Sequence, residues 1–216
     1  DTNTFTVNGN ITTSGTGAYA INNDANSAGN TFTLGGVVSG GMLNAGTNTV
    51  ITNTGSIDAI TNSGTLTTLT NSGTLTNITN SATISTFNND GVVSYSGALP
   101  VNYNLIINSS SDYGQIAFTS ISGTTNFGVY SSSTLAADTT YSSVITGLSA
   151  SDIASGTSGT FTDGDGSYAW TLNNSSSTIW DLVVGAFAPD APSAASTLTS
   201  IQSASYGIAS QFAGFA

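Results

Sequence analysis

Residues 52–96 read TNTGSIDAI, TNSGTLTTL, TNSGTLTNI, TNSATISTF and NNDGVVSYS, so this stretch repeats itself every nine residues. The second position of each unit is asparagine, and the fourth is glycine in every unit except for Ala82. The sixth position is always aliphatic, and the ninth is apolar until Ser96 ends the series. A fixed short period of this kind is typical of a solenoid, in which successive units stack as coils.

Each unit predicts a short β-strand and a corner. Thr, Ser, Gly and Asn are poor helix formers, whereas Thr, Ile and Val favour strands and Asn-Ser-Gly marks a turn. Two such units then make one full coil, and stacked coils lie about 4.8 Å apart, as paired strands do. This places Asn62 beneath Asn80 and predicts that stacked asparagine amides link the coils. The residues expected to point inward include Leu66, Leu75, Ile78 and Ile84.

A disordered, low-complexity tract is the alternative for this Ser-, Thr-, Asn- and Gly-rich stretch. Disorder does not require an aliphatic residue at two fixed places in each unit. The repeat therefore favours the solenoid.

The composition argues against several classes of function. The 216 residues include no Lys, Arg, His, Glu or Cys, and the eleven aspartates give a net charge of −11. Nucleic acid is disfavoured as a partner because phosphate binding rests on Lys and Arg, and anionic lipid head groups are disfavoured for the same reason. The absence of Cys excludes disulfides and thiolate metal sites. No stretch reaches the roughly 20 apolar residues of a membrane-spanning helix.

Two features of the sequence suggest a position outside the cell. A chain without Lys or Arg offers trypsin-like proteases no cleavage site. The chain also begins at Asp1 without a signal peptide, which we interpret as a processed mature fragment.

Residues 1–51 have the same character with a looser repeat. Polar and aliphatic residues alternate between Gly and Asn-Asn breaks, as in short strands. A separate small β-domain is the alternative. The expected core residues of this part are Ile11, Ile21, Phe32, Leu34, Val37, Val50 and Ile51.

The character changes at Gly97, after which Tyr and Phe become frequent and turns rich in Ser, Gly and Asp separate strand-like runs. We expect this β-rich region to close one end of the solenoid, because a bare terminal coil exposes unpaired backbone and apolar surface. The expected strands are 102–107, 114–119, 125–130, 141–145, 159–161, 168–172 and 178–184.

From Pro189 onward the strand signals end. An apolar stripe at spacings of three and four residues, interrupted by Ser205, predicts a helix from about residue 194, with Ser193 or Ser196 as its cap. A flexible tail is the alternative. The stripe consists of Leu198, Ile201, Ile208, Phe212 and Phe215. The predicted organisation is thus a solenoid over 1–96, a capping region over 97–188, and a linker with a helix over 189–216.

The order of these segments resembles a known family. Tandem NSGTLT repeats, then YNLIINSSSDYGQIAF, TNFGVY, YSSVITGLS and SYAWTLNNSSSTIWDLVV, then a helix of small residues, are similar to autotransporters of Gram-negative bacteria. The resemblance implies a β-helical passenger over 1–96, an autochaperone-like end over 97–188 and a linker over 189–216. The outer-membrane barrel of that family is absent from these residues. The resemblance supplies no active site, because many passengers are adhesins.

Candidate sites are few. The pair Asp163 and Asp165, in FTDGDGSYAW, could act as carboxylates in glycoside hydrolysis or bind Ca²⁺, but Asp-Gly-Asp-Gly is also the composition of a hairpin turn. The calcium loop pattern fails at Ser167 and lacks its glutamate. Trp170 and Trp180 lie among aliphatic residues and are expected in the core. Serine and thiol nucleophiles lack the His, Lys or Cys that they need. No catalytic, cofactor-binding or metal-binding residue is therefore predicted.

The sequence predicts an all-β, non-enzymatic, extracellular structural protein: a β-solenoid with nine-residue half-coils, a β-rich cap and a short carboxyl-terminal helix. The expected function is that of a subunit of a bacterial surface filament, built by head-to-tail assembly. The alternatives are an autotransporter adhesin fragment that binds a surface or a glycan, an assembly segment that only helps a larger passenger fold, and a secreted β-helical carbohydrate-active enzyme.

Overall fold

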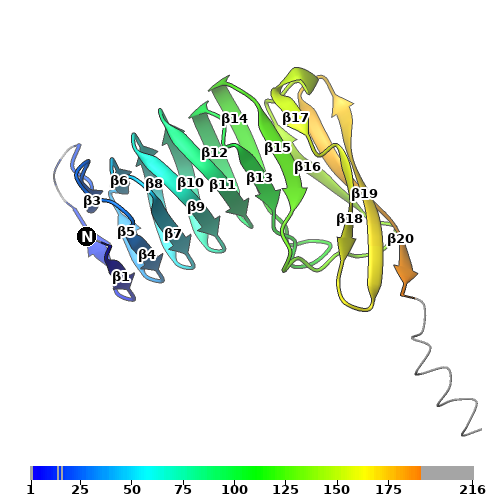
Figure 1. Ribbon diagram of the computed structural model, residues 1–216, viewed down its shortest axis with the longest axis horizontal. Helices are drawn as coiled ribbons and strands as arrows, with labels where there is room; N and C mark the ends of the chain where they lie inside the picture. Colours follow the sequence, from blue (N-terminus) through cyan, green and yellow to red (C-terminus); the bar gives the residue numbers. More distant parts are fainter. Residues whose placement is uncertain (1, 14, 16, 191–216) are drawn as a thin grey trace, which may run out of the picture.

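The computed structural model describes residues 2–13, 15 and 17–190 and shows an elongated, all-β coil (Figure 1). Two sheets run along its length. Sheet A has eight strands in the order β1-β4-β7-β9-β11-β13-β15-β17, and sheet B has twelve, including β8, β10, β12 and β14. The chain passes from one sheet to the other at each corner, which confirms the predicted β-solenoid.

The strands and the one 3₁₀ helix of the described residues have the following bounds: β1 Thr4–Val7, β2 Ile11–Thr12, β3 Ile21–Asn23, β4 Thr31–Leu34, β5 Val37–Ser39, β6 Met42–Asn44, β7 Thr49–Asn53, β8 Ser56–Asn62, β9 Thr65–Asn71, β10 Thr74–Asn80, β11 Thr83–Asn89, β12 Val92–Ala98, β13 Asn102–Leu105, β14 Gln115–Ser122, β15 Thr125–Val129, β16 Thr140–Thr146, η1 Ala150–Asp152, β17 Ile153–Ser155, β18 Ser158–Thr162, β19 Gly166–Ser176 and β20 Ile179–Pro189. The strands expected beyond Gly97 are all present within one to several residues of their expected bounds.

Each unit of the repeat is half a coil. In sheet A, Thr65 lies beside Thr83 in a parallel pair, and in sheet B Ser56 lies beside Thr74. Each partner lies two repeat units further along the chain, so one unit contributes a strand to sheet A and the next contributes a strand to sheet B. Parallel strands so close in sequence normally need a long crossover; here the opposite half of the coil serves as that crossover.

The core is a column of stacked apolar side chains between the two sheets. The sixth and ninth positions of the repeat point inward, as expected, and Leu66, Leu75, Ile78 and Ile84 are almost completely buried. Toward the carboxyl end the column widens to aromatic residues, with Phe87 next to Tyr103 at a ring distance of 5.7 Å. Burial of this column removes apolar area from water along the whole rod, the main favourable term in folding.

Two ladders of buried asparagines line the corners of the coils. In the first, Asn44 donates to Asn62 at 2.7 Å and Asn62 donates to Asn80 at 2.8 Å, each from Nδ2 to Oδ1. In the second, Asn53 donates to Asn71 at 2.7 Å and Asn71 to Asn89 at 2.9 Å. The side chains of both ladders are almost fully buried. Because a buried amide without partners is costly, these bonds let a polar residue occupy the interior at every turn.

The ladders end on defined acceptors at the carboxyl side. Asn80 donates to the Tyr95 hydroxyl at 2.9 Å and to the Ala98 carbonyl oxygen at 2.6 Å. Asn89 donates to the carbonyl oxygens of Gly91 and Gln115. The Tyr103 hydroxyl is buried close to the Asn89 side chain but has no hydrogen-bond partner among the described residues. The Tyr95 hydroxyl and backbone carbonyl oxygens thus accept from the last asparagine of each ladder where the repeat stops.

Close contact between corners requires glycine at the fourth position of several units, although one unit has Ala82 there. A Cβ atom on Gly73 would lie 2.2 Å from the Gly55 carbonyl oxygen, and one on Gly64 would lie 2.0 Å from that of Gly46. These corners stack backbone on backbone, so even a methyl group forces the coils to shift.

The carboxyl-terminal end of the rod contains antiparallel strands, whereas the coils before it are made of parallel strands. The coils continue in parallel through β16 and β17, and then β20 pairs antiparallel with β16, β19 with β20 and β18 with β19. The predicted core tryptophans belong to this region: Trp170 and Trp180 are both buried, and Trp180 Nε1 donates to the Leu148 carbonyl oxygen at 2.9 Å. The antiparallel strands thereby continue sheet B past the last coil, whereas sheet A ends at β17.

The expected core of residues 1–51 is partly wrong. Phe32, Leu34 and Ile51 are buried, whereas Ile11 and Ile21 are half-buried. Val37 is 38% exposed and Val38 is fully buried in its place. Val50 likewise points outward while its neighbour Ile51 points inward. In two adjacent apolar residues only one can face the core, because side chains alternate along a strand.

The predicted helix from residue 194, its apolar stripe and its cap at Ser193 or Ser196 lie outside the described residues.

Replacing Leu75 by Ala should lower the free energy of unfolding by about 2–5 kcal/mol, because truncation of a buried leucine leaves a cavity. Thr76→Ala, an exposed position on the same strand, is the matched control and should change it by less than about 0.5 kcal/mol. Urea unfolding measures both. Equal, small effects of the two variants would contradict the inward position of Leu75.

Replacing Asn71 by Asp should lower the free energy of unfolding by more than about 2 kcal/mol, because a buried carboxylate would face the acceptor oxygen of Asn89. Asn77→Asp, on the outer side of β10, adds the same charge with little loss. Acidification that protonates the introduced carboxyl should restore part of the stability, since it can then donate to Asn89. Thermal unfolding over a pH series tests this, and a loss that does not shrink in acid would contradict the ladder.

Candidate functional site

The amino-terminal end of the rod has no capping element among the described residues. β1 forms the edge of sheet A and pairs on one side only, in parallel with β4. β2 and β3 form the corresponding edge of sheet B and pair in parallel with β5 and β6. One side of each of these strands presents N–H and C=O groups to solvent, which is a template for pairing with another strand.

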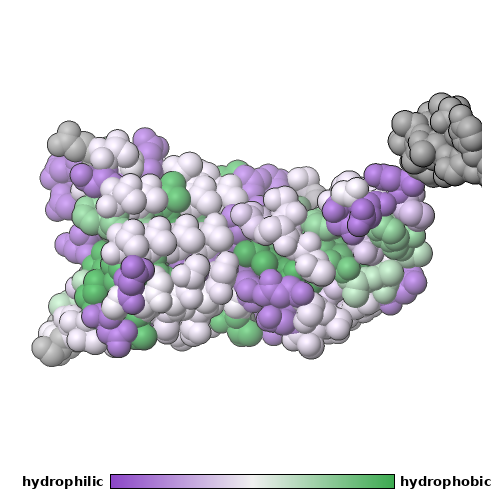
Figure 2. Space-filling model, turned by 90° about the horizontal axis from the view of Figure 1, so that it is seen from below, coloured by the Kyte–Doolittle hydropathy of each residue, from purple (hydrophilic) through white to green (hydrophobic). Residues whose placement is uncertain are grey.

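Apolar side chains accompany this unpaired edge. Phe5 is 44% exposed although its ring stacks on buried Phe32 at a centroid distance of 5.0 Å. Tyr19 is also exposed, and Val7 and Ile21 are only partly buried against the core. In Figure 2, hydrophobic residues are visible between hydrophilic ones at this end of the molecule, on the left. The end therefore exposes part of the core column that the rest of the rod encloses.

The carboxyl end also has strand edges, but they differ. Sheet A ends at β17, a short parallel strand whose Ala154 and Ser155 are exposed. Sheet B ends at β18, the outer strand of the antiparallel cap. The large apolar residues Phe161 and Trp170 of this cap are buried. The two ends of the rod are thus different surfaces: the amino-terminal end exposes core residues, whereas the cap buries its own.

The predicted aspartate pair lies in a hairpin turn. Residues 163–165 join β18 to β19, and Asp163 Oδ1 accepts hydrogen bonds from the backbone N–H groups of Asp165 at 3.1 Å and Gly166 at 3.2 Å. Gly164 has a φ of +97°, a conformation that glycine adopts without strain. Both aspartates are exposed. Asp163 therefore organises its own turn, as an aspartate commonly does.

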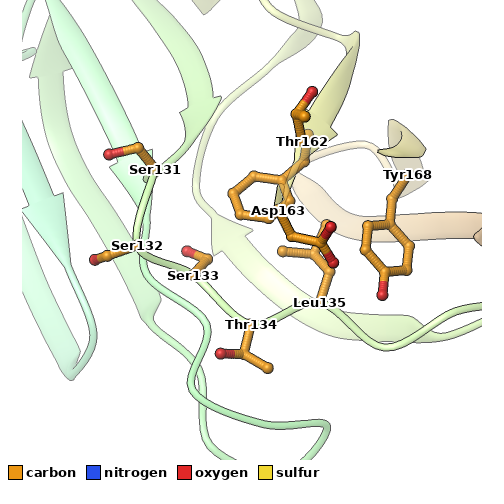
Figure 3. Close-up of a pocket in the computed structure, with 9 residues that line it drawn as sticks. Ser131, Ser132, Ser133, Thr134, Leu135, Thr162, Asp163 and Tyr168 are labelled. Atoms are coloured by element: carbon orange, nitrogen blue, oxygen red, sulfur yellow. The ribbon is translucent and has the colours of Figure 1, made fainter. Parts of the chain in front are cut away.

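A small cavity of about 330 Å³ lies beside this turn (Figure 3). The segment 131–135 forms one wall, and Phe161, Thr162, Asp163 and Tyr168 form the other. In Figure 3 the Tyr168 ring and the Asp163 carboxylate lie close together above Leu135. Desolvation, and then the charge of Asp163, raise the pKa of Tyr168. The polar side-chain groups of this cavity are hydroxyls and one carboxylate, that of the turn residue Asp163.

Two further carboxylates, one of them at the corner of the last repeat unit, share one amide. Asn108 Nδ2 donates to Asp90 Oδ2 at 2.8 Å and to Asp112 Oδ2 at 3.2 Å. The other oxygen of Asp90 is buried and has no partner among the described residues. Burial raises the pKa of Asp90, the hydrogen bond from Asn108 lowers it, and the charge of Asp112 raises it further, with a net upward shift. Earlier repeats carry Thr or Ser at this position.

Searches for similar proteins give no match to this chain among family models, curated proteins or solved structures. Within residues 2–13, 15 and 17–190, no helix is long and apolar enough to cross a membrane. The same residues include no group of three or more His, Cys, Asp or Glu that could hold a metal ion.

Asp90→Asn should raise the melting temperature at pH 7, where the wild-type carboxyl is charged. Because the pKa of Asp90 is raised in the folded state, folding favours the protonated form of its carboxyl group. The stability that the protonated carboxyl contributes is therefore present at low pH and is lost as pH rises through the folded pKa. The gain from Asp90→Asn should therefore shrink on acidification toward the ordinary aspartate pKa.

Asp165→Asn is the control for net charge, since the Asp165 carboxylate is exposed and makes no hydrogen bond among the described residues. Calorimetric scans from pH 3 to pH 7 measure both variants. An equal gain in the two variants would attribute the effect to total charge and contradict a local cause at Asp90.

Proposed function

We propose that this protein is an extracellular structural protein that assembles end to end into a filament, with the amino-terminal edge of one copy docked on the carboxyl-terminal edge of the next. The exposed, unpaired edge formed by β1, β2 and β3, with Phe5 beside it, is the observation that carries the proposal. A solenoid end of this kind is stabilised when another β-layer covers it.

The direction of sheet A supports a head-to-tail arrangement. All its pairs from β1 to β17 are parallel. A second copy displaced along the rod axis brings its β1 next to β17 in the same direction, so the sheet continues without reversal. A contact that joins two different surfaces and does not close into a ring produces an open filament.

The residue inventory supports a structural role. The chain has no Lys, Arg, His, Cys or Glu, which removes the groups that most often act as general base or activated nucleophile. The extracellular location is supported by the absence of trypsin cleavage sites and by the resemblance to autotransporter passengers. In that setting a rigid rod with few charged side chains is suited to building an extended surface structure.

Charge acts against assembly. Each copy carries a net charge of −11, so stacked copies repel one another at low ionic strength. Salt screens exposed charges beyond about 8–10 Å at 0.1–0.15 M. Assembly is therefore expected to increase with ionic strength and with protein concentration.

The test combines sedimentation velocity with negative-stain microscopy over a concentration and salt series. The full chain should form particles that lengthen with concentration and keep the width of one rod. Phe5→Asp places a charge on the edge and should give a folded monomer. A full chain that stays monomeric throughout would refute the proposal.

Val92→Asp is the matched control, because Val92 is 74% exposed on β12, away from both ends. It adds the same charge and should assemble like the wild type. Circular dichroism confirms that both variants fold. If Phe5→Asp still forms filaments, the amino-terminal edge is not the interface and the proposal fails.

A further inference from the structure

The outer surface of sheet A carries a regular two-column array of threonines over its first five strands. The strands β1, β4, β7, β9 and β11 lie side by side along the rod (Figure 1). Each has two residues on the outer side that flank one inward residue, such as Thr68 and Thr70 on either side of buried Leu69. On β11 the second of them, Asn88, is covered by its neighbours and is buried. The first column is Thr4, Thr31, Val50, Thr68 and Thr86; the second is Thr6, Thr33, Thr52, Thr70 and Asn88.

The nine-residue repeat supplies the array from Thr52 onward but not the members on β1 and β4. Thr4 pairs with Thr31 and Thr31 with Val50, and both pairs are further apart in sequence than the two repeat units that separate partners in the regular coils. The triplets TFT at 4–6 and at 31–33 nevertheless place threonine in both columns. The extra residues of these longer coils fall outside sheet A. The coil length therefore changes, but the triplet on sheet A and its strand register stay the same.

The hydroxyl groups of the array are available to a ligand. Apart from Thr70, which accepts a bond from Asn88 Nδ2 at 3.1 Å, no threonine of the array makes a side-chain hydrogen bond within the described residues. The five strands contain no aspartate, although the chain has eleven acidic residues. Further along sheet A, Asn104 donates to Asn88 and Asn126 donates to Asn102. The asparagine side chains in this part of the surface therefore hydrogen-bond to one another.

The spacings of the array are fixed by the backbone. Neighbouring strands are about 4.8 Å apart, and alternate residues of one strand are about 6.6 Å apart. Threonine is β-branched and stiff at χ1, so its hydroxyl and methyl groups occupy defined positions. Such a surface is preorganised and can bind a regular lattice through many weak contacts made together.

We propose that this array binds the surface of ice. Water oxygens on a prism face of hexagonal ice form a rectangular net with two spacings close to those of the array, and uncharged hydroxyl and methyl groups can join that net without strongly hydrated charges to disturb it. A crystalline polysaccharide is the other ligand with a regular lattice, but sugar rings are held by exposed aromatic faces, and the outward positions of the array contain none.

The experiment measures ice shaping and the gap between melting and freezing points of a single ice crystal in a solution of the full chain. It is done below the concentration at which end-to-end association is detected, so that its result does not depend on the proposed filament. The wild type should facet the crystal and open a measurable gap. Thr68→Tyr places a bulky ring in the middle of the array and should abolish most of that gap.

Thr79→Tyr is the matched control, because Thr79 is exposed on β10 of sheet B, the opposite side of the rod. It should retain the activity of the wild type, and both variants should melt at similar temperatures. Absence of ice shaping by the wild type, or equal activity of Thr68→Tyr and the wild type, would overturn the proposal. Pull-down on microcrystalline cellulose or chitin, with no effect on ice, would assign the array to a polysaccharide and would overturn it as well.

Discussion

The asparagine ladders are the constraint on which the rest of this structure depends. A coil made of two repeat units has to turn within a few residues at each side, and the backbone groups at such a corner cannot all pair within their own coil. Asn62 compensates for this by donating to the carbonyl oxygens of Gly64 and Thr83, and its bond to Asn80 satisfies the amide oxygen of the next coil. Backbone bonds between successive corners, such as Ser72 N–H to the Asn53 carbonyl oxygen, complete the pairing. The corners then stack so closely that glycine is needed at Gly64 and Gly73.

A strict period made the central part predictable. When the same residue recurs at a constant interval, the sequence alone predicts which side chain lies above it in the next coil. The contact of Asn62 with Asn80 and the burial of Leu75 could therefore be predicted from the repeat. Where the nine-residue period is lost, the sequence no longer predicts which side chains face the core. A shift of one residue turns a strand over, which is why Val37 was assigned to the core in place of Val38, and Val50 together with Ile51.

The ends of the rod and its outer surfaces could not be predicted from the sequence. The strand β17 was not expected, because its short run of mixed character gives no pattern. The threonine array was not expected either, because its members on β1, β4 and β7 are separated by unequal stretches of chain and only the strand register brings them together. The turn at Asp163, in contrast, was predicted as a hairpin, since Asp-Gly-Asp-Gly determines its local geometry alone.

The two ladders also give the rod an electrical direction. Every amide in them, from Asn23 and Asn44 through Asn80 and from Asn53 through Asn89, donates toward the carboxyl end. Reversing one amide would set donor against donor on one side and acceptor against acceptor on the other. Reversing a whole ladder would turn its amide oxygens toward backbone carbonyl oxygens such as that of Thr83, so the direction is fixed. Aligned amides polarise one another, and each ladder thus carries a permanent dipole whose negative pole lies at the open end of the rod.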